Sequence, residues 1–206
     1  MAVTLTRGYR YQWTDLSMVE ARERALELAN KAVELSHTTP QIYWALAYVR
    51  LHRREYNEAE KAAKQSITLS PNYADGYAIL ANIANWRGKW SEAVNYIKKA
   101  IELNPHYTFQ YPSTLGLSYY SLGRYQEAAA ALKESLNRNE SALNPRLFLA
   151  ANYIQLNQIE DAAWEVEQIN ANRPDIGLSN LDTVLPFEDK KYLIALKKEL
   201  QRAGLQ

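Results

Sequence analysis

The sequence predicts an all-α protein built from helical hairpins that stack on one another, and three observations lead to this prediction. Residues 88–107 (GKWSEAVNYIKKAIELNPHY) nearly repeat residues 54–73 (REYNEAEKAAKQSITLSPNY), with seven of the twenty aligned residues identical. Apolar residues recur in steps of four and three, which is the spacing of one helix face. Glycine and proline are few, with seven of each in 206 residues, and this disfavours a β-rich chain with many turns.

An alanine marks the same place in each copy of the repeat. Successive marker alanines are 34, 34, 35 and 34 residues apart. Each begins an apolar stripe that predicts the second helix of a pair, and upstream of all but the first lies another stripe that predicts the first helix. The marker alanines are Ala25, Ala59, Ala93, Ala128 and Ala162.

Each predicted pair of helices is joined by a short turn. Gly88 and Gly123 lie where a helix is expected to end in a left-handed residue, and Asn157 is the next best residue for that position. Arg54 occupies the same turn position in unit 40–73 and is the exception, because arginine does not favour a left-handed conformation. Thr39 and the proline after it predict a helix start. The prolines expected to end the second helices are Pro71, Pro105 and Pro174.

The pattern Tyr/Trp…Leu-Ala/Gly…Tyr…Gly-x-Tyr/Trp-x-x-Ala…Ala…Leu-x-Pro resembles the tetratricopeptide repeat, a 34-residue helix–turn–helix unit. The resemblance implies an α-solenoid, a right-handed superhelix of about five units with a C-terminal capping helix, in one domain over residues 1–206. The expected units are 6–39, whose first helix is degenerate, then 40–73, 74–107, 108–142 and 143–175, with 176–206 as the capping segment.

The end of the chain does not follow the repeat. Residues 188–206 (EDKKYLIALKKELQRAGLQ) predict an amphipathic helix with Leu193, Leu196 and Leu200 on one face. We expect this helix to cover the apolar edge of the last unit. The ending RPD…LPFED…Y…L…L…AGL also resembles the C-termini of tetratricopeptide domains that are attached to bacterial nucleotide cyclases and winged-helix regulators.

Composition disfavours several classes of function. The chain has 24 Lys and Arg against 23 Asp and Glu, so its charge indicates no nucleic-acid partner. Cysteine is absent, the three histidines lie in different units and the glycines are scattered singly, so we expect no catalytic residue, no metal and no cofactor. No apolar run reaches the roughly 18–20 residues of a membrane span. We expect a soluble cytoplasmic protein, or a periplasmic one if the chain is a fragment of a membrane-bound regulator.

The face of the first helices that points away from the core is the expected binding surface. Aromatic rings and amides dominate it, and both suit an extended or helical peptide. We therefore predict a protein or peptide partner. For the two tryptophans on this face, packing against a neighbouring unit is the alternative. The predicted partner-binding residues are Gln41, Trp44, Tyr48, His52, Asp75, Asn82, Asn85, Trp86, Leu117 and Tyr120.

Unit 108–142 has one residue more than its neighbours, close to Pro112. Because proline is tolerated in the first turn of a helix, the simple interpretation is that the first helix of this unit starts late. The functional interpretation is that the offset widens the groove between units.

These observations favour a non-catalytic protein-interaction module, acting in signalling or as a scaffold, that binds a peptide or partner surface in an aromatic-rich concave groove. The alternative is the C-terminal regulatory or sensor domain of a larger bacterial signalling protein, either a nucleotide cyclase or a transcription regulator. A ligand pocket between Trp44, Tyr48 and Trp86 is a third hypothesis. The sequence leaves the oligomeric state and the identity of the partner open.

Overall fold

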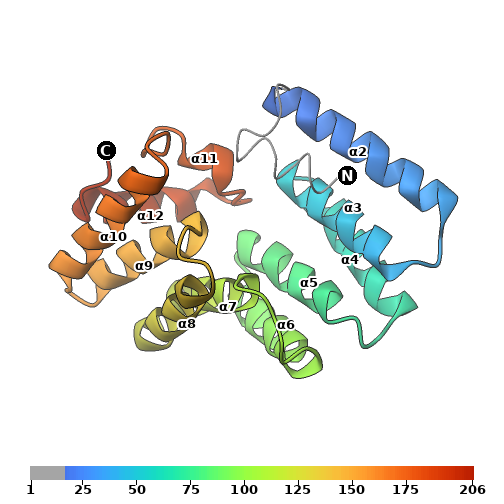
Figure 1. The fold of residues 1–206 in the computed structure, drawn as a ribbon, viewed down its shortest axis with the longest axis horizontal. Coiled ribbons are helices and arrows are strands. Elements are labelled where there is room, and N and C mark those ends of the chain that lie inside the picture. The colour runs from blue at the N-terminus through green and yellow to red at the C-terminus, as the bar shows by residue number, and fades with distance from the viewer. Residues whose placement is uncertain (1–16) are drawn as a thin grey trace.

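The computed structural model describes residues 17–206, and this part of the chain consists of helices and connecting loops without a strand (Figure 1). The predicted all-α solenoid is confirmed. The helices are α2 (Met18–Leu35), α3 (Pro40–His52), α4 (Tyr56–Leu69), α5 (Ala74–Trp86), α6 (Trp90–Leu103), α7 (Gln110–Ser121), α8 (Tyr125–Arg138), α9 (Leu143–Gln155), α10 (Ile159–Asn172), α11 (Leu181–Val184) and α12 (Lys190–Arg202). The degenerate first helix that the sequence predicts for unit 6–39 falls mostly outside the described residues.

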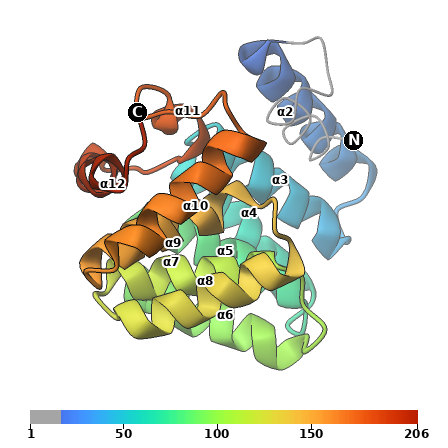
Figure 2. The ribbon, with the colours of Figure 1, turned by 60° about the vertical axis from the view of Figure 1, so that its left-hand side comes forward.

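The helices pack in the order that a solenoid requires. Within a unit the first and second helices form a hairpin: α3 with α4, α5 with α6, α7 with α8, and α9 with α10. Each second helix packs on the first helix of the next unit, and the first helices α3, α5, α7 and α9 lie side by side (Figure 2). We call these four the first-helix wall, because they form one continuous layer.

The marker alanines hold the paired helices together. All five are fully buried, at 0% exposure. Alanine has high helix propensity and no long side chain, so it allows two helices to approach closely at a cost of little conformational entropy. The periodic pattern in the sequence is therefore a packing pattern, and it carries no information about the ligand.

The turns between paired helices share one backbone conformation. Gly88 and Gly123 have φ values of 75° and 74°, and Asn157 has φ 58°, as their positions predict. Arg54 also has a positive φ, 64°, although a side chain in this region costs about 1–2 kcal/mol. Each turn closes with one equivalent backbone bond from an N–H to a helix carbonyl: Glu55 to Arg50, Lys89 to Ala84, Arg124 to Tyr119 and Gln158 to Tyr153.

Two helix starts carry the prolines that the sequence placed there. Pro40 is the first residue of α3, and Thr39 precedes it, but the Thr39 hydroxyl makes no cap bond and instead lies 2.8 Å from the Ser36 hydroxyl. Helix α7 begins at Gln110, so Pro112 lies in its first turn. The extra residue of this unit is thus accommodated by a late start of the helix.

The C-terminal segment reaches further than the sequence indicated. Leu193, Leu196 and Leu200 are buried on one face of α12, as predicted. However, α12 packs against α9, and the residues between α11 and α12 contact the turn that follows α3 and the end of α5. The segment therefore runs back along the first-helix wall and packs on α9 of the last unit, because the wall offers it apolar and aromatic surface.

Candidate functional site

An aromatic column lies on α3. Trp44, Tyr48 and His52 are one helical turn apart, so their side chains share one face. The Trp44 and Tyr48 rings stack with centroids 5.9 Å apart, and the Tyr48 and His52 rings lie 4.6 Å apart at 59°. All three side chains are half-buried, and Gln41 at the start of the same face is exposed. We call Trp44, Tyr48 and His52 the α3 column.

A polar seam joins α5 to α7. The Tyr111 hydroxyl donates to the Asp75 carboxylate at 2.7 Å, and burial, followed by this acceptor, raises the pKa of Tyr111. The Thr114 hydroxyl lies 3.4 Å from the Asn82 side-chain oxygen. These bonds leave Asp75 and Asn82 partly exposed, so both keep a surface toward solvent.

Asn85 belongs to the same seam, and the structure corrects the prediction that it offers its amide to a partner. Its side chain is fully buried. The Asn85 amide donates to the Thr114 carbonyl at 2.9 Å and accepts from the Ser118 hydroxyl at 2.8 Å. Since donor and acceptor are both used within the fold, Asn85 holds two helices in register.

Trp86 and Leu117 are also buried, at 4% and 3% exposure, so neither presents its side chain to a partner in this structure. The Trp86 ring packs edge-on against Phe187, with centroids 4.9 Å apart, and lies 6.3 Å from the Phe148 ring of α9. Trp86 therefore packs inside the protein, as the alternative of packing against a neighbouring unit implied, and one partner of its ring is the C-terminal segment. The local sequence around Trp86 contains no signal for that partner.

Tyr120 is covered by α12. Its hydroxyl donates to the Glu199 carboxylate, which also accepts from the Gln155 amide. The Tyr120 ring lies 5.7 Å from the Phe148 ring. Burial raises the pKa of Tyr120, and it also raises the pKa of the Glu199 carboxyl, while the bonds from Tyr120 and Gln155 lower the Glu199 pKa in part. Glu199 thus ties α12 to both α7 and α9.

We expect Glu199→Gln to change how stability depends on pH. Because the folded-state pKa of Glu199 lies above its ordinary value of 4.5, the carboxyl favours folding below that pH, and this contribution is lost as the pH rises through the folded-state pKa. The Gln side chain does not titrate. Urea unfolding between pH 4 and 8 should show a wild-type decline that the variant lacks, on the order of 1 kcal/mol or less because the group is partly exposed. Equal pH profiles for both proteins would contradict this.

Four residues hold the loop between α11 and α12, and the sequence indicated only one of them, Trp86, as a contact residue. The Arg54 guanidinium donates to the Phe187 carbonyl at 3.1 Å and also to the Asp182 carbonyl. The Tyr56 hydroxyl donates to the Pro186 carbonyl at 3.1 Å.

The other two belong to the end of α5. The Trp86 carbonyl accepts from the Glu188 backbone N–H at 2.8 Å, and the Arg87 side chain forms an ion pair with the Glu188 carboxylate at 3.1 Å. These contacts connect positions about a hundred or more residues apart, so no local pattern predicts them.

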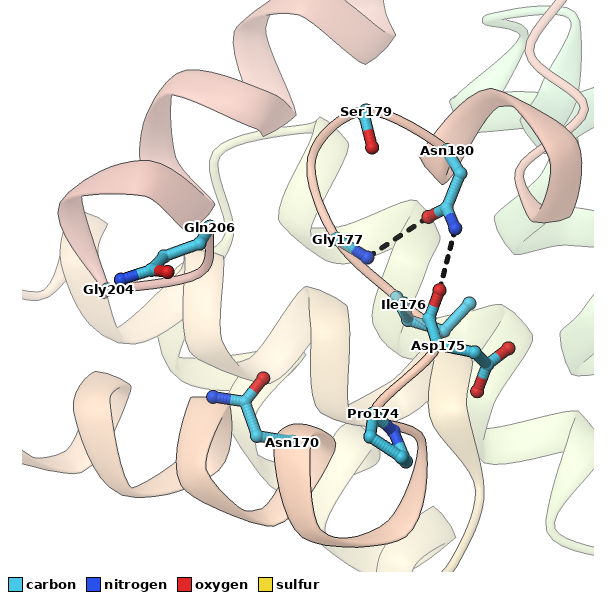
Figure 3. A pocket seen from close by; sticks show the side chains of 9 residues that line it. All are labelled: Asn170, Pro174, Asp175, Ile176, Gly177, Ser179, Asn180, Gly204 and Gln206. Carbon is cyan, nitrogen blue, oxygen red and sulfur yellow. Dashed lines mark hydrogen bonds between the residues drawn. The ribbon is translucent and has the colours of Figure 1, made fainter.

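A shallow hollow of about 530 Å³ lies beside the C-terminal end of the described chain (Figure 3). Its loop is held by the Asn180 side chain, which accepts from the Gly177 N–H at 3.0 Å and donates to the Asp175 carbonyl at 2.6 Å. The Asp175 carboxylate pairs with Arg173, which lowers its pKa. The Asn180 and Asp175 side chains of the hollow are therefore engaged within the loop itself.

Within residues 17–206, no group of three or more His, Asp and Glu side chains is arranged to hold a metal ion. No helix in the same range is both long enough and apolar enough to span a membrane.

Comparison with known proteins agrees with the fold. Residues 40–73 and 119–181 each match a family profile described as tetratricopeptide repeat. No curated protein matches the sequence significantly.

Among solved structures, a tetratricopeptide protein of Thermus thermophilus, TTC0263, is 23% identical with a TM-score of 0.67, over 95% of this chain and 99% of that one. YrrB, described as a tetratricopeptide protein with an unusual peptide-binding site, is 16% identical with a TM-score of 0.58, over 86% and 91%. The type IV pilus biogenesis factor PilW is 16% identical with a TM-score of 0.69, over 98% and 86%.

Proposed function

The chain is a tetratricopeptide repeat protein, and from this premise we propose that it is a non-catalytic interaction module whose α3 column binds an extended peptide of a partner protein. Proteins built from such repeats present extended concave surfaces to protein and peptide partners. The proposal places the contact on Trp44, Tyr48 and His52, with Gln41 at one end and the partly exposed Asp75 and Asn82 beside it on α5.

The stacked geometry of the α3 column is the observation that carries this proposal. Each ring is braced by its neighbour one turn away, so its orientation is set before a partner arrives. Aromatic side chains have few rotatable bonds and large contact area, and they are enriched among the residues that dominate binding energy. The amide and carboxylate groups beside the column supply hydrogen bonds for a peptide backbone. A small, transient interface between a peptide and such a surface typically has micromolar affinity, which is a binding free energy of about −8 kcal/mol.

A second candidate function rests on the last residues of the chain. The ending from Arg173 to Leu205 resembles the C-termini of domains attached to nucleotide cyclases and winged-helix regulators. In that case the chain is the regulatory end of a larger bacterial signalling protein, and the α3 column contacts an upstream domain of the same polypeptide. The mass of the native polypeptide in its host separates the two: about 24 kDa, as for these 206 residues, supports the separate module.

The test compares partner binding by the wild type and by Trp44→Ala/Tyr48→Ala. The control is Trp164→Ala, which removes a tryptophan that is 52% exposed on α10, away from the column. We expect a partner captured from host lysate to lose at least tenfold in affinity with the double variant and to be unaffected by the control. Circular dichroism must show that both variants fold. Equal binding by all three proteins would overturn the assignment to the α3 column.

A further inference from the structure

The loop between α11 and α12 is held by hydrogen bonds to the main chain of three successive residues, and a bond from the Phe187 N–H to the Leu185 carbonyl, 3.0 Å, turns the chain tightly at Pro186. The Pro186 carbonyl accepts from Tyr56 at 3.1 Å, the Phe187 carbonyl accepts from Arg54 at 3.1 Å, and the Glu188 N–H donates to the Trp86 carbonyl at 2.8 Å. Bonds to the main chain of a ligand are one of the ways in which proteins bind peptide segments. Residues 185–189 (LPFED) are called the strap below.

Two side chains of the strap add specificity to these main-chain bonds. The Phe187 ring packs edge-on against Trp86 and lies 6.3 Å from the Tyr192 ring, which leaves it 4% exposed. The Glu188 carboxylate pairs with Arg87. Pro186 has no N–H, so its nitrogen needs no hydrogen-bond acceptor. Leu185, the apolar residue before it, is fully buried. The contacts therefore fit a short segment with the pattern apolar, proline, aromatic, acidic.

The residues that hold the strap do more than bury apolar surface, because some of them contact it through polar, solvent-exposed side chains. Arg54 occupies a left-handed turn position where the other turns have Gly88, Gly123 and Asn157, and its guanidinium bonds to backbone carbonyls. Its side chain is exposed, and the Glu188 side chain is 42% exposed. The Arg54 and Glu188 side chains are thus open to solvent, while the Arg87 side chain is 16% exposed and the Phe187 ring is enclosed.

We propose that Arg54, Tyr56, Trp86 and Arg87 form a peptide-binding site for short segments of the pattern apolar–proline–aromatic–acidic, turned at the proline, and that the strap occupies this site as a built-in ligand. A partner segment with the same pattern displaces the strap. The site shares no residue with the α3 column, so the proposal does not depend on the function proposed above.

Tethering sets how strongly the strap competes. A ligand joined by a short connection acts at an effective concentration on the order of 1 mM. If the site binds a free segment with a Kd of about 10 µM, the strap leaves it open roughly 1% of the time, so a peptide in solution binds about 100-fold more weakly than to the open site. Weakening the strap should recover most of this factor.

The probe is a fluorescently labelled peptide of residues 183–190 (TVLPFEDK), and its anisotropy is measured with the full chain. We expect weak binding to the wild type and binding at least tenfold tighter to Phe187→Ala/Glu188→Ala, in which the strap loses its ring and its ion pair. The matched control, Ile194→Ala/Lys198→Ala, changes exposed residues of α12 and should bind like the wild type. Adding Arg87→Ala to the weakened strap, or replacing the phenylalanine of the probe by alanine, should remove the gain.

The proposal is overturned if the weakened-strap variant binds the probe no better than the wild type. Hydrogen exchange of residues 182–189 in that variant distinguishes two reasons for such a failure. Protected amides mean that the strap stays bound and cannot be displaced. Exchanging amides mean that the strap leaves the site but the open site does not bind peptide. A gain that persists with Arg87→Ala also overturns it. Trp44→Ala/Tyr48→Ala should leave probe binding unchanged, so a failure here is distinct from a failure of the α3 column.

Discussion

Trp86→Ala is expected to lower the free energy of unfolding by about 3–5 kcal/mol, the usual cost of removing a large buried aromatic side chain. Trp86 is 4% exposed and packs against Phe187 and Phe148. Its loss leaves a cavity between the first-helix wall and the C-terminal segment, so both should loosen. Urea unfolding followed by circular dichroism measures the change, and hydrogen exchange at residues 182–189 should rise.

Trp164→Ala is the control for this prediction, because its side chain is 52% exposed. The substitution also gives up the contact of the Arg146 guanidinium with the Trp164 ring, 5.5 Å from its centroid, so we expect a cost of about 1 kcal/mol or less. If Trp86→Ala were as mild as Trp164→Ala, the packing of Phe187 on Trp86 would be wrong, and Trp86 would again be available as a partner-binding residue.

Arg146→Met should also cost about 3–5 kcal/mol, because it breaks a buried ion pair and leaves a charge without its partner. The Arg146 guanidinium lies 2.6 Å from the Glu165 carboxylate, and the two side chains are 8% and 4% exposed. Arg146 also donates to the Glu140 carbonyl at 2.8 Å. Urea unfolding at neutral pH measures the loss.

The pH dependence of this variant identifies the cause. Burial raises the pKa of Glu165, and Arg146 lowers it in part, so removing the arginine raises it further. A carboxyl with a raised folded-state pKa favours folding at low pH and opposes folding at pH values above that pKa. The loss of stability in Arg146→Met should therefore shrink as the pH falls toward 4.5.

Two comparisons complete this test. The double variant Arg146→Met/Glu165→Leu should recover most of the stability, because no buried charge remains. Arg24→Met breaks an exposed pair with Glu27, 2.7 Å apart, and should cost less than about 1 kcal/mol. A deficit that is constant with pH, or a double variant no better than the single one, would show that the loss is not electrostatic.

The fold was predictable from the sequence because its signals are local and repeated. The marker alanines appear at nearly constant spacing, and all are buried. Gly88, Gly123 and Asn157 have the left-handed conformation that their positions indicate. Pro112 lies in the first turn of α7. Each of these features depends on residues within about one repeat, so periodicity alone identifies it.

The binding surface could be predicted only in part from the periodicity of the sequence. The helical period places Trp44, Tyr48 and Trp86 on corresponding faces of α3 and α5, but it does not say what covers each face. Trp44 and Tyr48 remain half-buried, whereas Trp86 lies beneath Phe187. The two helices have the same pattern and different surroundings, because Phe187 of the strap packs on Trp86 of α5.

The sequence by itself determined the helix pairs, their turns and the order in which they stack, since each unit contacts its neighbours through residues at fixed spacing. Only the tertiary structure decided where the C-terminal segment lies. Its bonds join Arg54 to Phe187 and Tyr56 to Pro186, across 133 and 130 residues. Contacts between residues so far apart in the sequence leave no periodic pattern in it. They form only where the first-helix wall, once folded, presents a complementary surface to the C-terminal segment.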